Sequence, residues 1–283
     1  MKVLQHPHEI QSLVKKLKSE GKQIGFVPTM GALHEGHLSL VKQACHDCNI
    51  VIVSVFVNPL QFGPNEDLDQ YPRTLEADKA LLEKDNVDYL FCPMAAEMYP
   101  EGKTEAIELK NQAMLKVLCG AFRPGHFEGV LTVVAKLFSL VMPDKAYFGS
   151  KDYQQAILVQ QMVHDLSFNV EIVMMPIIRD REGLALSSRN QYLSAGDRKR
   201  ALALPETLQW VKGQIEAGQV CDLKELRQQA FMRLAAAVDK ADYLEIIDPR
   251  SLAALSQIQP EMRAAAACIV GKTRLIDNVI ITP

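Results

Sequence analysis

Two histidines stand three residues apart in the stretch PTMGALHEGH, residues 28–37. The apolar run GFV precedes this stretch and LSLVKQAC, with helical spacing, follows it, which predicts a strand, a loop and a helix in succession. Gly31 and Gly36 allow the backbone to approach a bound group closely, while the helix N-terminus offers free N–H groups and a positive dipole end. Because imidazole also donates hydrogen bonds to phosphate oxygens, His34 and His37 favour a phosphate site.

Two other interpretations of the histidine pair stay open. Cys45 and Cys48 would complete a zinc-type ligand set, although helical spacing places both thiols on one apolar stripe with Leu38 and Val41, where buried cysteines are common. Alternatively, the histidines only cap a turn. A metalloprotease site is excluded, because HEGH is one residue short of the HExxH motif and its histidines cannot adopt the i, i+4 geometry.

Four further segments place polar side chains at predicted strand ends or at the entry to a domain. They are FVNPLQF (56–62), RPGHFEGV (123–130), FGSKDYQQ (148–155) and ALSSRN (185–190). Each is a weak signal alone, because an exposed lysine is usually a solvated charge and a Ser-Ser pair is usually part of a loop. Together their amides, hydroxyls and cations suit a polyphosphate and a small hydroxy acid.

In this order and spacing, the five segments resemble the pantoate–β-alanine ligase family, and the resemblance spans essentially the whole chain, including the closing TRLIDN (273–278). HxGH and the later Ser-Ser-Arg also resemble the two signatures of the wider nucleotidyltransferase group, which includes class I aminoacyl-tRNA synthetases. Two positions differ from the family's usual pattern. Ser150 stands where the family often has Glu in FGxKD, and Cys119 stands where it often has Glu ahead of RPGHF.

The resemblance implies an ATP-dependent condensation of (R)-pantoate with β-alanine to pantothenate, AMP and diphosphate, through a pantoyl-adenylate intermediate. The implied catalytic residues are His37, His34, Lys151 and Arg189, with His37 assisting pyrophosphate departure. The implied substrate-binding residues are Gln61, Gln155 and Asn58. Asp152 is implied to help hold Mg²⁺, which prefers hard oxygen ligands. The implied ATP-binding residues are Met30, Gly31, Ala32, Leu33, His34, Glu35, Gly36, His37, Gly149, Ser150, Lys151, Asp152, Ile178, Leu186, Ser187, Ser188 and Arg189.

Two other functions are weighed against this one. A nucleotidyltransferase that stops after modifying a phosphate ester is disfavoured, because the neutral amides of FVNPLQF and KDYQQ suit an uncharged polyol better than a second phosphate. A zinc-stabilised interaction module would rest on His34, His37, Cys45 and Cys48, and metal analysis would decide it. A tRNA ligase is less favoured still, since the chain is acidic and shows no anticodon-binding appendage.

Composition and charge restrict the class of protein. The 283 residues are 48% apolar and 23% charged, as in globular proteins with a real core. Net charge is −3 and no basic block exceeds RKR (198–200), which argues against nucleic acid as a partner. No apolar run approaches the roughly 18 residues of a membrane span, and the N-terminus is too polar for a signal peptide. We expect a cytoplasmic enzyme with small-molecule substrates and reduced cysteines, without a membrane partner, and the resemblance implies a homodimer.

Strands and helices alternate along the first part of the chain. Strands are expected at 23–28, 50–59, 87–93, 145–149 and 170–178, and helices at 8–21, 37–47, 74–86, 128–141 and 152–166. This alternation predicts an α/β fold with a Rossmann-like, doubly wound parallel sheet.

The pattern changes after Pro176. A loop over 179–194 leads to a helical region ending near residue 240, and three strands close the chain at 242–248, 264–271 and 273–282. We therefore expect a second, smaller α+β domain. The predicted domains are 1–176, which binds ATP and pantoate, and 177–283, a lid that closes over ATP and shields the adenylate from water.

Overall fold

The computed structural model describes residues 1–64, 66–100, 112–220 and 222–283. The chain divides into two compact units. The first comprises Met1–Asn111, Arg123–Ser150 and Gln155–Pro176, and the second comprises Gln112–Phe122, Lys151–Gln154 and Ile177–Pro283. The second unit thus includes two short stretches that precede residue 176. A single boundary at residue 176 therefore does not describe the division of the chain.

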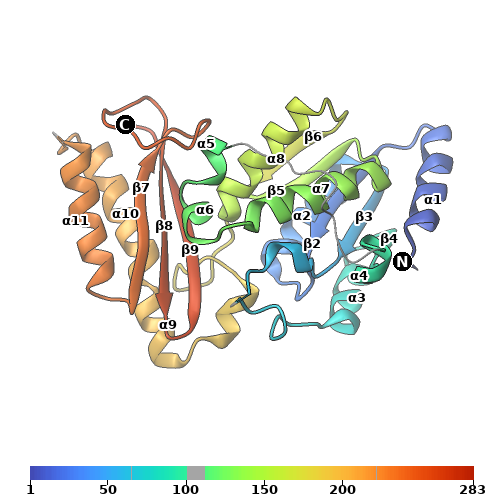
Figure 1. The fold of residues 1–283 in the computed structure, drawn as a ribbon, viewed down its shortest axis with the longest axis horizontal. Helices are drawn as coiled ribbons and strands as arrows, with labels where there is room; N and C mark the ends of the chain where they lie inside the picture. The colour runs from blue at the N-terminus through green and yellow to red at the C-terminus, as the bar shows by residue number, and fades with distance from the viewer. Residues whose placement is uncertain (65, 101–111, 221) are drawn as a thin grey trace. The chain divides into compact units, whose positions relative to one another are not determined.

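Among the described residues, the first unit is built on a six-stranded parallel sheet in the order β1-β4-β3-β2-β5-β6. Figure 1 labels its strands β2 to β6. Its strands are β1 (Lys2–Leu4), β2 (Ile24–Thr29), β3 (Ile50–Val55), β4 (Tyr89–Phe91), β5 (Lys145–Gly149) and β6 (Glu171–Met175). The helices that connect them are α1 (Pro7–Ser19), α2 (Glu35–Asp47), α3 (Leu75–Lys84), α4 (Ala95–Met98), α7 (His126–Val141) and α8 (Tyr153–Asp165). The expected Rossmann-like parallel sheet is confirmed.

Helices cover both faces of this sheet, as two neighbouring residues of β2 demonstrate. Gly25 faces α2, because a Cβ built there would lie 3.4 Å from the Ala44 methyl group. Phe26 faces α7, where its ring lies edge-on to Phe138 with the centroids 6.4 Å apart. Since successive side chains of a strand point to opposite faces, the sheet is doubly wound.

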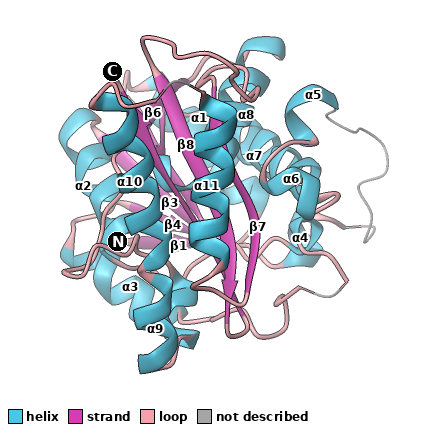
Figure 2. Ribbon diagram, turned by 90° about the vertical axis from the view of Figure 1, so that its left-hand side faces the viewer, coloured by secondary structure: helices cyan, strands magenta, loops and turns pink. Residues whose placement is uncertain are grey.

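The second unit contains a three-stranded antiparallel sheet in the order β7-β8-β9, with β7 (Lys240–Ile247), β8 (Met262–Val270) and β9 (Thr273–Ile281). Helices α10 (Ala203–Glu216) and α11 (Leu223–Ala235) pack side by side on this sheet (Figure 2). Alternate residues of β8 enter the shared apolar core: Ala264, Ala266, Cys268 and Val270. The unit also holds α5 (Gln112–Leu115), α6 (Cys119–Phe122) and α9 (Ala195–Ala201). The expected α+β arrangement is confirmed.

Several element boundaries differ from the predicted ones. Helix α2 begins at Glu35, two residues early, because His34 caps it. Helix α7 begins at His126, so this histidine lies in its first turn rather than ahead of it. Strand β3 ends at Val55, and a 3₁₀ turn, η1 (Pro59–Gln61), follows it. In the part of the chain that the structure describes, no helix is both long and apolar enough to cross a bilayer.

Candidate functional site

The strand order of the first unit reverses between β2 and β5. Strands β3 and β4 lie on one side of β2, whereas β5 and β6 lie on the other. In open parallel sheets, ligands bind beyond the carboxyl ends of the strands at such a reversal. The histidine loop follows Thr29 at the end of β2, and Gly149 ends β5. Two of the predicted ATP-binding segments therefore flank the position where this class of sheet binds ligands.

A buried carboxylate that sequence reasoning missed holds the histidine loop. Asp78 of α3 is only 1% exposed, and its two oxygens accept hydrogen bonds from the backbone N–H groups of Ala32 (3.0 Å) and Leu33 (2.9 Å). The preceding Gly31 has φ +84°, and a Cβ there would lie 2.9 Å from Val55 Cγ1, so a larger residue does not fit. A single aspartate 46 residues from Ala32 carries no local sequence signal for this contact.

The two histidines cap α2 through their Nδ1 atoms. His34 Nδ1 accepts from the Gly36 N–H at 3.1 Å, and His37 Nδ1 accepts from the His34 N–H at 3.3 Å. A neutral imidazole that accepts at Nδ1 carries its proton at Nε2, so each ring has an Nε2–H donor. The ring centroids are 4.1 Å apart at the positive end of the helix. Capping and phosphate binding are therefore compatible, because the cap selects the tautomer that a phosphate requires.

The two thiols of the zinc interpretation have partners of their own. Cys45 Sγ donates to the Asp85 carbonyl at 3.6 Å, and Cys48 Sγ lies 3.6 Å from the Tyr147 hydroxyl. Burial raises the pKa of both thiols, which disfavours the thiolate form that zinc binds. Within the described ranges, no cluster of three or more His, Cys, Asp or Glu side chains could hold a metal ion. These contacts argue against zinc.

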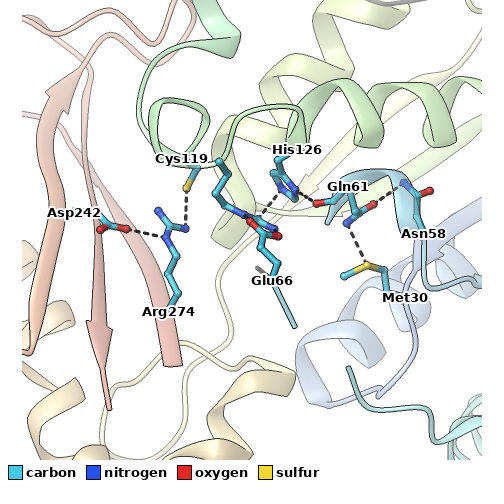
Figure 3. Close-up of polar contacts among 9 residues, drawn as sticks. Met30, Asn58, Gln61, Glu66, Cys119, His126, Asp242 and Arg274 are labelled. Carbon is cyan, nitrogen blue, oxygen red and sulfur yellow. Dashed lines mark hydrogen bonds and ion pairs between the residues drawn. The ribbon is translucent and has the colours of Figure 1, made fainter. Parts of the chain in front are cut away.

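Asn58 and Gln61 form a buried amide pair around η1. Asn58 Nδ2 donates to Gln61 Oε1 at 3.0 Å, and Asn58 Oδ1 accepts from the Tyr99 hydroxyl at 2.9 Å. Gln61 Nε2 in turn donates to Met30 Sδ at 3.1 Å (Figure 3). Because a thioether is a weak acceptor, a substrate oxygen would compete well for this donor. Asn58 uses both ends of its amide inside the protein and thereby orients Gln61.

The two adjacent glutamines of KDYQQ have different surroundings. Gln154 is 5% exposed, and its Nε2 donates to the carbonyls of Met114 (2.9 Å) and Val117 (2.8 Å). Its Oε1 accepts from the Cys119 N–H at 3.0 Å, so its amide is committed to the fold. Gln155 is half-buried in the first turn of α8 and remains the substrate-binding candidate.

The two positions that differ from the family's usual pattern make hydrogen bonds within the protein. Ser150 Oγ donates to the Met175 carbonyl at 2.8 Å and links the ends of β5 and β6. Cys119 Sγ lies 3.1 Å from the Tyr243 hydroxyl. It also accepts from Arg274 at 3.6 Å (Figure 3). Neither residue makes these contacts with a predicted site residue.

In the second unit, Lys151 and Asp152 lie in a short 3₁₀ turn, η2 (Ser150–Asp152), with Lys151 Nζ 3.9 Å from Asp152 Oδ2. Asn278 Nδ2 donates to the backbone carbonyl of Lys151 at 3.1 Å, and Asn278 Oδ1 accepts from Arg263 at 2.5 Å. The Asp152 side chain is 51% exposed, so its carboxylate is accessible to a cation. One such oxygen ligand, with phosphate oxygens and waters, fits Mg²⁺.

Backbone and side-chain contacts order the segment after Ile177. The Leu186 N–H donates to the Ile178 carbonyl at 2.9 Å, which folds the segment back on itself. Arg179 forms a fork with the buried carboxylate of Asp277, at 2.6 and 2.9 Å. Two of the predicted ATP-binding residues are therefore neighbours in space, and a strand of the same unit anchors the loop between them.

The predicted site residues fall into two sets, one in each unit. In the first set, the rings of His34 and His37 are in contact, and Gln61 donates a hydrogen bond to Met30. Glu35 forms an ion pair with Lys42 at 3.7 Å. In the second set, Ser187 Oγ accepts from the Arg189 N–H at 3.3 Å and starts the 3₁₀ turn η3 (Ser188–Tyr192). The first unit holds residues 30–37, 58, 61, 149, 150 and 155, and the second holds 151, 152, 178 and 186–189.

Comparison with known proteins finds relatives that match almost the whole chain. The family model described as pantoate-beta-alanine ligase matches residues 2–280. The curated pantothenate synthetase of Caldicellulosiruptor bescii is 50% identical over 283 residues, covering 99% of each chain. The pantothenate synthetase structure from Thermus thermophilus is 45% identical, with TM-score 0.92 and full coverage of both chains. The Francisella tularensis pantoate-beta-alanine ligase, complexed with "Beta-gamma ATP" and β-alanine, is 36% identical, with TM-score 0.82 and coverage of 99% and 97%. The chain belongs to the pantoate–β-alanine ligase family.

Proposed function

We propose that this ligase uses ATP to convert pantoate into an acyl adenylate and then joins the acyl group to β-alanine. The observation that carries the proposal is the pair of imidazole Nε2–H donors at the N-terminus of α2, beside the reversal in strand order. Family membership supports the substrates, because relatives that cover the whole chain are pantothenate synthetases.

The order of the chemical steps follows from the reactivity of a carboxylate. Direct attack by an amine would expel an oxide, which is a very poor leaving group. When a carboxylate oxygen of pantoate attacks the α-phosphorus of ATP, the bond to the bridging oxygen breaks and pyrophosphate leaves. The unprotonated amine of β-alanine then attacks the acyl carbon, AMP departs with the carbon–oxygen bond electrons, and the new amide loses a proton.

The first step accumulates negative charge on the departing pyrophosphate. In this proposal His34 and His37 donate to phosphate oxygens through Nε2–H, with His37 on the leaving group. Lys151, Ser188 and Arg189 add further donors and positive charge. Removing one donor of this kind typically costs about 3–4 kcal/mol of transition-state stabilisation.

Pantoate is bound by neutral amides in this proposal. Gln61 and Gln155 bind its hydroxyl groups and carboxylate, with Gln61 also near β-alanine, while Asn58 orients Gln61. Asp152 is the residue that would hold Mg²⁺, and the bound ion would neutralise charge on the phosphates. We expect chelation of Mg²⁺ to abolish activity and Asp152→Asn to raise the Mg²⁺ concentration required.

The overall reaction tests the proposal directly. Purified protein is incubated with ATP, Mg²⁺, pantoate and β-alanine, and pantothenate and AMP are quantified. We expect equal amounts of both products, and neither product when any one substrate is omitted. Folded protein that forms no pantothenate would overturn the assignment.

We also propose a homodimer, which rests on the family resemblance. Light scattering of the purified protein measures its mass in solution. Twice the chain mass of 31.6 kDa is the expected result, and a mass of one chain would contradict it.

A further inference from the structure

His126, the first residue of α7, connects a charged pair to the backbone of Gln61. Its Nε2 lies 2.9 Å from Arg123 Nη1, and its Nδ1 lies 2.8 Å from the Gln61 carbonyl oxygen (Figure 3). A guanidinium only donates and a carbonyl only accepts. The neutral imidazole therefore accepts from Arg123 at Nε2 and donates to Gln61 from Nδ1, and no other tautomer satisfies both contacts.

Arg123 is itself held by a carboxylate. Its Nε lies 2.7 Å from Glu66 Oε1 and its Nη2 lies 2.5 Å from Glu66 Oε2, which is a two-point fork. Burial raises the pKa of Glu66, but the hydrogen bonds and charge of Arg123 outweigh burial and hold that pKa below its ordinary value. With two of its nitrogens on Glu66, the guanidinium presents Nη1 to His126.

The turn that carries Gln61 is pinned to α7 at further points. A Cβ on Gly129 would lie 2.3 Å from the Leu60 carbonyl oxygen, so only glycine lets the helix approach η1 this closely. Asn58 Nδ2 donates both to the Gly129 carbonyl (3.1 Å) and to Gln61 Oε1 (3.0 Å). The backbone oxygen and the side-chain oxygen of Gln61 are both held, and its Nε2 is the end that points toward Met30.

We propose that His126, oriented by Arg123 and Glu66, is a positioning residue that sets the direction of the Gln61 amide toward pantoate. The proposal rests on the substrate role of Gln61 in the proposed function. His126 acts through the backbone of η1 and does not contact the reacting atoms. Small displacements of a positioning group reduce productive binding, so loss of the His126 contact weakens pantoate binding selectively.

Two substitutions distinguish the loss of the hydrogen bond from His126 to Gln61 from the loss of the ring volume. His126→Phe keeps a ring but removes both nitrogens, whereas His126→Asn keeps an N–H near the Nδ1 position. We expect His126→Phe to raise the KM for pantoate about tenfold, with the KM for ATP changed by less than about twofold. We expect His126→Asn to have a KM for pantoate close to that of the wild type. Equal increases in both KM values, or an Asn variant no better than Phe, would overturn the proposal.

A matched control shows whether lost stability alone raises the KM for pantoate. Val133 is buried in the same helix, two turns further along, so Val133→Ala lowers Tm without removing a contact to η1 of the kind His126 makes. We expect its KM for pantoate to equal that of the wild type. An increase in KM as large as that of His126→Phe would mean that lost stability, not positioning, is responsible.

A double-mutant cycle with Gln61→Ala distinguishes the positioning role of His126 from the substrate role of Gln61. If His126 acts through Gln61, His126→Phe adds no further increase in pantoate KM when Gln61 is already alanine. If Gln61→Ala alone raises the pantoate KM and His126→Phe does not, the positioning role fails while the substrate assignment stands. If Gln61→Ala leaves the pantoate KM unchanged, the substrate assignment and the positioning role both fail.

Discussion

Asn278 donates a hydrogen bond of 3.1 Å from its side-chain amide to the backbone carbonyl of Lys151. The preceding residue, Asp277, holds the guanidinium of Arg179 in a fork. Two consecutive residues of β9 therefore anchor two segments of the second unit that carry proposed phosphate-binding groups. This gives the closing TRLIDN stretch a physical role in the proposed site.

Asn278→Ala should destabilise the protein and weaken ATP binding together. The substitution frees the Lys151 carbonyl and also deprives the buried Arg263 of the acceptor it contacts at 2.5 Å. Leaving buried polar groups without partners costs about 1–3 kcal/mol. We expect urea unfolding to show that loss and steady-state kinetics to show a raised KM for ATP. Gln229→Ala, at an exposed position on α11, is the control that should change neither, and a normal KM for ATP in the Asn278 variant would contradict the anchoring role.

Asp78→Asn should destabilise the histidine loop at constant side-chain size. One of the two carboxylate oxygens becomes an NH₂ group, which cannot accept from the N–H of Ala32 or Leu33. We expect the free energy of unfolding to fall by about 1–3 kcal/mol and turnover to fall with it. Glu76→Gln on the same helix, where the side chain is 85% exposed, should change stability by less than about 0.5 kcal/mol. Equal stability of the two variants would argue that Asp78 does not hold the loop.

Substitution of His37 tests its proposed role as a donor. His37→Ala removes the Nε2–H group, and we expect kcat to fall by about 10² to 10³. His37→Gln places an amide N–H near the Nε2 position and should retain part of the lost rate. Pre-steady-state measurement of pyrophosphate release would report the affected step. A folded His37→Ala enzyme with near-normal kcat would contradict the assignment.

The ion pair of Glu66 and Arg123 predicts a pH-dependent contribution to stability. Folding lowers the pKa of Glu66 below its ordinary 4.5. Burial opposes this change, but the contacts of the carboxylate, with Arg123 the foremost, together outweigh it. A carboxyl group of this kind stabilises the fold above its unfolded pKa, and the stabilisation is lost as the pH falls through its folded pKa. Glu66→Gln should therefore lower the free energy of unfolding near neutral pH by about 1 kcal/mol. The difference from the wild type should disappear in acid, and a difference that stays constant below pH 4.5 would contradict this account.

The order of strands and helices in the first unit could be predicted because its local patterns are strong. The β-branched run at 50–55 predicts a strand that is covered on both faces, and β3 is that strand. Element ends were less predictable, since they depend on side-chain contacts. His34 starts α2 two residues early by capping it. Strand β1 has only three residues, which is too short for an alternating pattern to show.

The candidate site could be predicted only where its chemistry lies within one short stretch. The histidine loop is such a stretch, and its sequence favours phosphate binding. The structure adds that Nδ1 of each ring caps α2, which leaves Nε2–H as the proposed phosphate donor. The residues that hold the loops were not identified. Asp78 acts on Ala32 from 46 residues away and Tyr99 acts on Asn58 from 41, and nothing local to either position reveals the contact.

In the proposed reaction, pantoate is activated as an adenylate before β-alanine enters. The most direct test is isotope exchange between pyrophosphate and ATP, with Mg²⁺ and pantoate present and β-alanine omitted. We predict exchange that depends on pantoate, since reversal of the first step returns labelled pyrophosphate to ATP. Absence of exchange in an enzyme that still forms pantothenate and AMP once β-alanine is added would contradict the two-step order.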